Sequence, residues 1–257
     1  MSNKRPALAV LGLMAATALS ACVTLPPNAP RSRQDPFERW NRGVYNFNDV
    51  LDRHVAKPVA RTYVRVVPHP VRTGVSNFFA NLDTPTVMIN DALQGQFRSA
   101  ANDLGRFLLD STVGLGGLLD PATQIGMDRN DADFGETLGV WGMHPGPFLE
   151  LPLLGPSDMR DGPARVVDAY TNPAKYVTNT DVTYGLLGLD LVKTRASLLP
   201  LDATLKNAFD PYAFIRNAFL QHRAYMIAQV KDSSADDSPS ENPGNDRVVA
   251  KPAGGKP

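Results

Sequence analysis

The chain has 257 residues, with 26 basic and 26 acidic side chains and a formal net charge of zero. General nucleic-acid binders carry a clear excess of basic residues, so we expect no nucleic-acid partner. Beyond Ala18, no apolar run approaches the roughly 20 residues that a membrane-spanning helix needs.

The first residues have the form of a bacterial export signal. Lys4 and Arg5 form its basic end, and an apolar region follows over residues 7–18, too short to stop transfer across a membrane. Leu19-Ser20-Ala21-Cys22 then resembles the lipobox of bacterial lipoproteins, and Cys22 is the only cysteine, so it cannot form an internal disulfide. We predict a signal peptide over 1–21, lipidation of Cys22 and a tether to residue 34. The alternative is an ordinary signal peptide with a chance cysteine.

Basic residues gather shortly after this segment. Between Arg31 and Arg72 there are nine lysines and arginines and four acidic residues, 9 − 4 = +5. Such a stretch can face anionic lipid head groups. A solvated helix face explains it equally well, and both interpretations stay open.

Helix-start signals recur from residue 35 onward. Each combines a capping residue or a proline with an apolar face at spacings of three and four. They place helix starts at Asp35-Pro36, Pro70, Thr84-Pro85, Asp133, Asp181 and Asp210-Pro211, with further helices over Phe97–Leu108 and Met159–Tyr170.

Other residues predict where the helices end. Pro58 is expected to interrupt the first helix, and Gly95 to close the one opened at Thr84-Pro85. Residues 232–257 are polar and rich in Ser, Asp, Pro and Gly, which predicts a disordered tail. No stretch shows sustained alternation of apolar and polar residues. The predicted fold class is therefore all-α, a single domain over 35–231 built of mostly short helices that begin at proline.

The stretch from Asp133 to Asp161 is the most unusual part of the chain. Asp133 can cap a short helix, and Glu136 can reach back to the cap amide. An apolar, Gly- and Pro-rich connector follows, and Ser157 can cap the next helix. Surface connections are normally polar, so this one indicates a membrane interface, a lipid path or a buried crossover.

An enzyme is the rival class. A lipid hydrolase would need a G-x-S-x-G elbow and a histidine base, and that elbow is missing from the sequence. The chain has four histidines, none in an H-E-x-x-H pair, so we expect no metal site and no catalytic residue. His144, inside the central connector, is the one histidine worth testing.

Many short blocks, in order along the chain, resemble one family, the MlaA (VacJ) outer-membrane lipoproteins. They are Asp35-Pro36-Phe37-Glu38, Asn41-Arg42, Tyr45-Asn46-Phe47-Asn48, Pro58-Val59-Ala60, Pro68-His69-Pro70-Val71-Arg72, Ser76-Asn77-Phe78, Asn81-Leu82, Leu93-Gln94-Gly95, Gly105-Arg106-Phe107, Gly114-Leu115-Gly116-Gly117, Asp133-Phe134-Gly135, Thr137-Leu138-Gly139, Gly146-Pro147, Leu151-Pro152, Arg160-Asp161 and Asp210-Pro211-Tyr212. The resemblance runs from the lipobox to about Ala228.

The resemblance implies a ring-like helical protein embedded in the outer membrane, with a central channel and no enzymatic activity. Such proteins remove phospholipids that have strayed into the outer leaflet, pass them to a soluble periplasmic carrier, and associate with a porin trimer. It further implies anchoring from the periplasmic side through diacylglycerol and an N-acyl chain on Cys22, with no other cofactor. The alternative is a porin-associated structural lipoprotein that transports nothing itself.

With this resemblance in view, we expect the central stretch to line or gate the lipid path. Glycines there permit backbone angles that other residues avoid and a close approach of lipid. The candidate residues are Phe134, Gly135, Leu138, Gly139, Trp141, Gly142, Gly146, Pro147, Leu151, Pro152 and Arg160. Arg160 can bind phosphate near a helix start, but an ion pair with Asp158 or Asp161 is the favoured interpretation.

Overall fold

The structure is a computed structural model and describes residues 35–236. The predicted signal peptide, Cys22, the tether and residues 237–257 lie outside the described part. The helices are α2 (Glu38–Leu51), α3 (Lys57–Val66), α4 (His69–Leu93), α5 (Phe97–Thr112), α6 (Pro121–Gln124), α7 (Phe134–Val140), α8 (Asp161–Thr171), α9 (Thr180–Leu198), α10 (Asp202–Asn207) and α11 (Pro211–Asp236). Two strands, β1 (Phe148–Leu151) and β2 (Gly155–Asp158), form an antiparallel hairpin.

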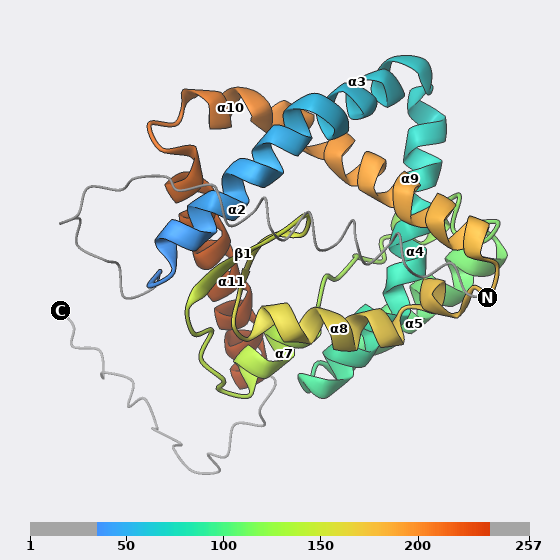
Figure 1. The fold of residues 1–257 in the computed structure, drawn as a ribbon. Coiled ribbons are helices and arrows are strands. Elements are labelled where there is room, and N and C mark those ends of the chain that lie inside the picture. Colours follow the sequence, from blue (N-terminus) through green and yellow to red (C-terminus); the bar gives the residue numbers. More distant parts are fainter. Residues whose placement is uncertain (1–34, 237–257) are drawn as a thin grey trace, which may run out of the picture.

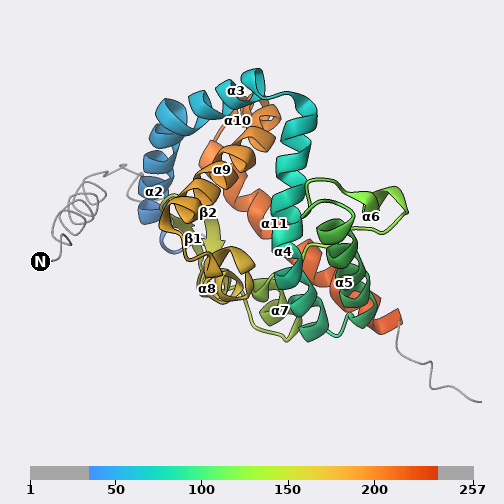
Figure 2. The ribbon, with the colours of Figure 1, turned by 90° about the vertical axis from the view of Figure 1, so that its right-hand side faces the viewer.

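The helices follow one another around a ring (Figure 1). Helices α2 and α3 form one side, α4 turns the corner, α7 and α8 lie opposite, and α9 returns along α3 towards α10 and α11. Helices α5 and α6 project to one side of this ring when the molecule is turned by 90° (Figure 2). The all-α prediction is confirmed, with the small hairpin as its one addition among residues 35–236.

Two prolines do not divide the helices where the sequence predicts a boundary. The backbone stays helical from Glu38 to Val66, because a π-helical turn over Asp52–Ala56 precedes Pro58. A wider turn accommodates a proline ring that would clash with the carbonyl four residues earlier. Pro85 lies inside α4 rather than at a new helix start. Packing of α4 along α5 outweighs the local cost of that proline.

Two predicted caps are also wrong. Asn179, not Asp181, caps α9 by accepting from the amides of Asp181 and Val182. Asp35 is fully buried and makes no cap. Its carboxylate instead accepts from Asn41 Nδ2 at 2.8 Å and pairs with Arg216 at 3.0 Å. Asp35 therefore joins the start of the described chain to α11, which closes the ring.

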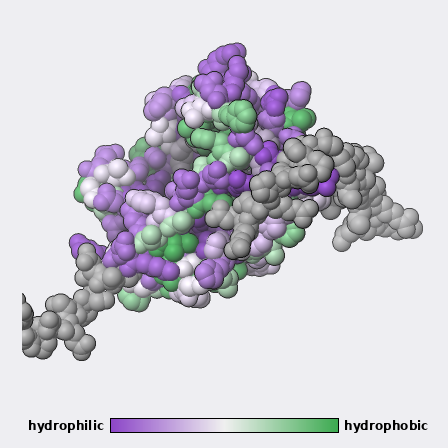
Figure 3. Space-filling model, turned by 90° about the vertical axis from the view of Figure 1, so that its left-hand side faces the viewer, coloured by the Kyte–Doolittle hydropathy of each residue, from purple (hydrophilic) through white to green (hydrophobic). Residues whose placement is uncertain are grey.

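The distribution of polarity is inverted relative to a water-soluble protein. Buried side chains are mostly polar or charged, such as Asp91, Asp103 and Arg106, and few are large and apolar. Many large apolar side chains are exposed instead, on every helix from α2 to α9 except α6 and α7, and hydrophobic residues lie open among hydrophilic ones in Figure 3. Exposed apolar surface of this extent indicates contact with lipid or partners. None of the described helices has the length and apolar character required to span a bilayer.

The last helix is longer than expected. Helix α11 continues to Asp236, so residues 232–236 belong to it rather than to a tail. Ser233 Oγ donates to the Val230 carbonyl in its final turns. Helix α11 thus continues five residues past residue 231, where the sequence predicts the tail to begin.

Candidate functional site

Helix α7 opens the central stretch as predicted. Asp133 caps it by accepting from the Glu136 amide at 2.8 Å. The reciprocal half of the predicted capping box does not form, since the Glu136 carboxylate has no hydrogen-bond partner among the described residues. Burial opposes ionisation of Asp133, but Arg223 pairs with it at 2.7 Å and holds the pKa of this carboxyl below its usual range.

Gly135 and Gly139 allow α7 to pack closely against its neighbours. A Cβ on Gly135 would meet the Asp161 carboxylate at 2.5 Å, and one on Gly139 would meet Ile227 at 2.4 Å. Both glycines are buried between α7, the start of α8 and α11. They position α7 and do not line an open path in this structure.

Arg160 belongs to a buried ion-pair network. Its Nε bonds to Asp161 at 2.7 Å, and its Nη2 lies 3.8 Å from Asp158. Arg223 of α11 pairs with the other oxygen of Asp161 at 2.7 Å. The favoured ion-pair interpretation of Arg160 is confirmed, and the side chain, 5% exposed, is not available to a lipid phosphate.

The segment after α7 is an exposed turn. Gly142 and Gly146 adopt φ angles of 97° and 70°, so both occupy the left-handed region that favours glycine. Trp141 is largely exposed, and its Nε1 donates to the Leu93 carbonyl at 3.0 Å. Its ring also meets Phe134 edge to face, at 6.3 Å between centroids. These residues form the accessible part of the predicted lipid path, together with half-buried Leu138 and Pro147.

The apolar connector is a β-hairpin rather than an irregular crossover. Phe148 pairs with Asp158 and Leu151 with Gly155, so Ser157 lies in β2 and does not cap α8. Phe148 is fully buried against Tyr212 and Phe219. Pro152 begins the turn, whose tip exposes Leu153 and Leu154.

Two asparagines of α2 hold this hairpin, and the predicted site did not include them. Asn41 donates to the Phe148 carbonyl and accepts from the Glu150 amide, each at 3.0 Å. Asn48 donates to the Leu151 carbonyl at 3.0 Å and accepts from the Leu153 amide at 2.8 Å. We call Asn41 and Asn48 the asparagine clamp. Its sequence signal is two amides seven residues apart, which places them two turns apart on one helix face.

Glu150 is the polar centre of the hairpin. It is 3% exposed and accepts from Asn48 Nδ2 at 3.2 Å. Burial raises its pKa to about 7, against the opposing effect of Asn48 and Arg165.

A metal-binding cluster is not found in the described part of the chain. No group of three or more His, Asp or Glu side chains there could hold a metal ion. His144 lies exposed in the turn between Gly142 and Gly146 and makes no side-chain hydrogen bond or ion pair with a described residue.

A helical ring with a polar interior, an apolar exterior and a clamped hairpin defines a membrane-associated helical protein. The family model of the MlaA lipoprotein matches residues 33–226, and the chain belongs to this family.

Named relatives and one solved structure agree with this assignment. The chain is 36% identical to the intermembrane phospholipid transport system lipoprotein MlaA of Shigella flexneri, over 83% of this chain and 84% of that one. It is 32% identical to the protein of the same name from Haemophilus influenzae, over 88% and 94%. A solved structure on the maintenance of bacterial outer-membrane lipid asymmetry matches with a TM-score of 0.68 and 35% identity, over 77% of this chain and all of that one.

Proposed function

We propose that this protein removes phospholipids from the outer leaflet of the outer membrane and passes them towards the periplasm, which maintains lipid asymmetry. The observation that carries this proposal is the 36% identity to a phospholipid-transport lipoprotein across more than four fifths of both chains. The polar interior and exposed apolar exterior support it, because a lipid needs a polar route for its head group and an apolar surface for its tails.

The lipid path in this proposal runs past the exposed turn and the hairpin. Trp141, Gly142, Gly146, Pro147, Leu151 and Pro152 lie there, and the hairpin tip at Leu153 and Leu154 is apolar and accessible. Gly135, Gly139 and Arg160 act as positioning residues, since they fix α7 against α8 and α11. The hairpin is the mobile gate of this path, and the asparagine clamp sets its resting position.

The remaining parts of the proposal concern place and partners. The protein is anchored to the outer membrane of a Gram-negative cell from the periplasmic side, through diacylglycerol and an N-acyl chain on Cys22. It carries no other cofactor and catalyses no reaction. A porin trimer and a soluble periplasmic lipid carrier are its protein partners, and phospholipid is its cargo.

Outer-leaflet phospholipid in living cells tests the proposal. Cells that lack the protein should accumulate surface phospholipid, and the wild-type chain should restore the normal level. A variant of the exposed hairpin tip, Leu153→Asp, should still co-purify with the porin yet fail to restore it. If Leu153→Asp fully restored the normal level of surface phospholipid, the hairpin tip would not be part of the lipid path. Unchanged surface phospholipid in cells without the protein would favour a structural lipoprotein that transports nothing.

A further inference from the structure

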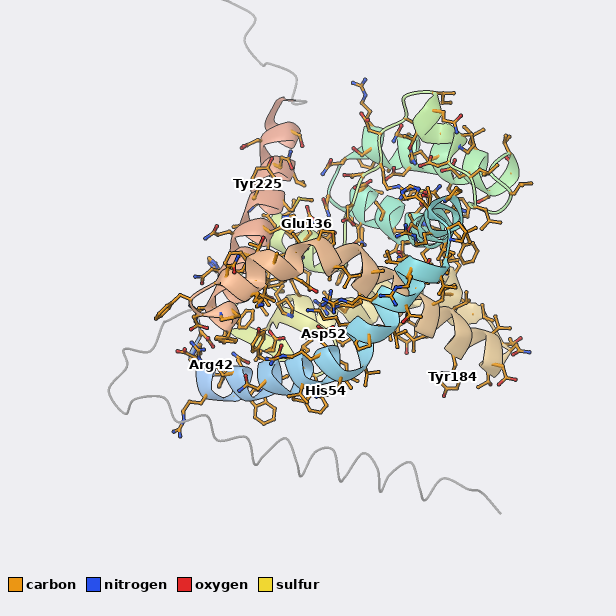
Figure 4. The ribbon with its side chains drawn as sticks, turned by 90° about the horizontal axis from the view of Figure 1, so that it is seen from above. Arg42, Asp52, His54, Glu136, Tyr184 and Tyr225 are labelled. Carbon is orange, nitrogen blue, oxygen red and sulfur yellow. The ribbon has the colours of Figure 1, made fainter. Side chains whose placement is uncertain are left out.

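A small polar pocket lies where α7 meets α11 and the loops after α4 and α6. Its volume is about 230 Å³, and Gln94, Gln96, Asn130, Asp131, Glu136 and Gln229 contribute polar side chains to its wall. None of the described residues that line it is a lysine, an arginine or an aromatic residue. Figure 4 shows Glu136 beside α11, the helix that also carries Tyr225.

Glu136 is the unexplained charge of this pocket. The residue is 2% exposed, and its carboxylate has no hydrogen bond or ion pair with any described residue, although it lines the pocket. A buried carboxylate without a partner is costly, so such a group calls for an occupant. The sequence predicts that this carboxylate accepts from the amide of the cap residue, Asp133. In the structure the carboxylate does not make this bond and faces the pocket instead.

The charged groups around Glu136 do not neutralise it. Burial is the main cause that raises its pKa to about 7, and Arg223 on α11 opposes this effect. Asp131 and Asp133 before α7, and Asp161 of α8, add to the rise. A cation placed against the carboxylate would offset both the burial and the negative neighbours.

The pocket wall is rich in hydrogen-bond acceptors. Asp131 supplies a second carboxylate, and Asn130 uses its Nδ2 to donate to Asp91 at 2.6 Å, which leaves its amide oxygen as an acceptor. Gln94 uses its Nε2 on Thr137 at 3.0 Å, and its Oε1 already accepts from Gln96 Nε2 at 3.3 Å, which leaves one of the two lone pairs of that oxygen. A primary ammonium has three N–H donors and no acceptor, so its needs match this wall.

Other cations fit less well. A quaternary ammonium such as choline donates no hydrogen bond and is normally held by aromatic rings, which the described wall lacks. A divalent metal ion would need more carboxylates than this pocket gathers among residues 35–236. The volume admits a head group but not an acyl chain.

We propose that the pocket centred on Glu136 binds the primary ammonium of a phosphoethanolamine lipid head group. The proposal rests on the proposed function for the lipid itself and names the head group that this site selects. Helix α7 carries Glu136 in its first turn and ends beside the exposed turn at Trp141, so one element links the head-group site to the gate.

Soluble head groups test the pocket without any transport. Calorimetry on the detergent-solubilised full chain should show tighter binding of glycerophosphoethanolamine than of glycerophosphocholine, by at least tenfold. Glu136→Gln should lower the affinity for glycerophosphoethanolamine at least tenfold without lowering the unfolding temperature. Asp181→Asn, which changes an exposed acid of α9, should have no effect. Equal affinity for the two probes, or equal binding by wild type and Glu136→Gln, would overturn the proposal.

The pH dependence of the affinity for glycerophosphoethanolamine provides a second test of the same site. Binding needs the ionised carboxylate, so the affinity of the wild type should rise about tenfold from pH 6 to pH 8, and that of Glu136→Gln should stay flat. A wild-type affinity that is flat across this range would count against Glu136 as the group in contact.

Lipid composition in cells separates this proposal from the proposed function. Glu136→Gln should leave phosphatidylethanolamine enriched over phosphatidylglycerol in the outer leaflet, relative to wild type. Clearance of both lipids at the wild-type ratio would overturn the head-group site and leave transport intact. Failure of the wild type to clear either lipid would overturn transport, and the calorimetric result would still decide the pocket.

Discussion

At the scale of single residues, the asparagine clamp explains how an isolated two-stranded hairpin keeps its place. Such a hairpin is marginally stable alone, and its outer strand exposes unpaired amides and carbonyls. Asn41 and Asn48 each donate once to the hairpin backbone and accept once from it, as the backbone of a neighbouring strand would. A helix thus replaces the missing third strand.

Loss of one clamp residue should destabilise the fold. Asn41→Ala leaves the Phe148 carbonyl and the Glu150 amide without partners, and each buried unsatisfied group costs about 1–3 kcal/mol. The unfolding temperature followed by circular dichroism should fall by at least about 5 °C. Asn46→Ala, an exposed residue of the same helix, is the control and should change little. Equal unfolding temperatures of Asn41→Ala and Asn46→Ala would contradict the stabilising role of the asparagine clamp.

Buried Glu150 makes stability depend on pH. Its pKa is about 7 in the folded protein and near 4.3 in an unfolded chain, so the folded state holds the proton more tightly. Stability from this group is therefore complete below about pH 4.3 and is lost as pH rises to about 7. Glu136 and Asp91, whose pKa values burial also raises to about 7, act in the same direction.

Glu150→Gln imitates the neutral form and isolates this contribution. The variant should melt at a higher temperature than wild type at pH 8, and should lose less stability between pH 5.5 and pH 8. Thermal unfolding at the two pH values provides the measurement. If Glu150→Gln and the wild type lost the same stability between pH 5.5 and pH 8, Glu150 would not titrate in this window.

At the scale of elements, the turn and the hairpin connect α7 to α8. The ion pairs of Arg160 and Arg223 fix the start of α8 to α7 and α11. The turn that begins at Gly142 has no ion pair with a described residue, and Arg160 holds it only by donating to the carbonyls of Met143 and Pro145. Motion in this region is therefore expected in the turn and hairpin tip rather than in the helices.

Valine at either glycine of the turn should block transport. Positive φ at Gly142 and Gly146 costs a β-branched residue about 1–3 kcal/mol, and a Cβ at Gly146 also meets Met159 at 3.1 Å. Gly142→Val and Gly146→Val should leave a folded, porin-bound protein that clears little surface phospholipid. His144→Ala should be nearly silent, because no proton transfer is proposed.

Gly185→Val is the matched control for this experiment. Gly185 lies in α9 with open space around it, and clearance should persist. Normal clearance of surface phospholipid by both turn variants would show that the turn does not gate the lipid path. Loss of folded protein would show that the two glycines are needed only for folding. A folded but inactive His144→Ala would reopen the enzyme hypothesis.

At the scale of the whole molecule, the inverted polarity matches a protein that rests in a lipid interface. Exposed apolar side chains on most helices of the ring favour the membrane, and each buried methylene group contributes about 0.8 kcal/mol. Lipid chains on Cys22 would add to this affinity and set the side from which the ring approaches.

Removal of the lipid chains on Cys22 should separate their contribution to membrane binding from that of the exposed apolar side chains. Cys22→Ser should leave the protein unacylated, and membrane fractionation should find most of it away from the outer membrane. The wild type and the Asn46→Ala variant provide the reference distribution. Unchanged sedimentation of Cys22→Ser with the membrane would count against the lipobox.

Most of the helical plan could be predicted from the sequence, because it depends on local signals. Asp133 and Asp210 act as caps, and prolines occupy the first turns of α3, α4, α6 and α11. The positive φ angles of Gly142 and Gly146 likewise follow from residue type. The family could be inferred from ordered motifs alone, and the family model confirms it.

The candidate site was predicted only in part, because several of its residues act through distant contacts. Gly135 and Gly139 proved to be packing residues and Arg160 an ion-paired one, since α8 and α11 lie against α7. The hairpin could not be read from its apolar connector, because Asn41, more than a hundred residues away in the chain, completes its hydrogen bonds.

The sequence alone determined several helix starts, such as those at Asp133 and Asp210, the left-handed glycines and the family, since each depends on a few neighbouring residues. Only the tertiary structure decided that helix passes through Pro58 and Pro85, and that Asp35 joins the ends of the ring instead of capping a helix. It alone also decided that Glu136 faces a pocket. The physical reason is that burial and long-range partners set the energy of a proline, a carboxylate or an unpaired amide, and these arise only when distant segments meet.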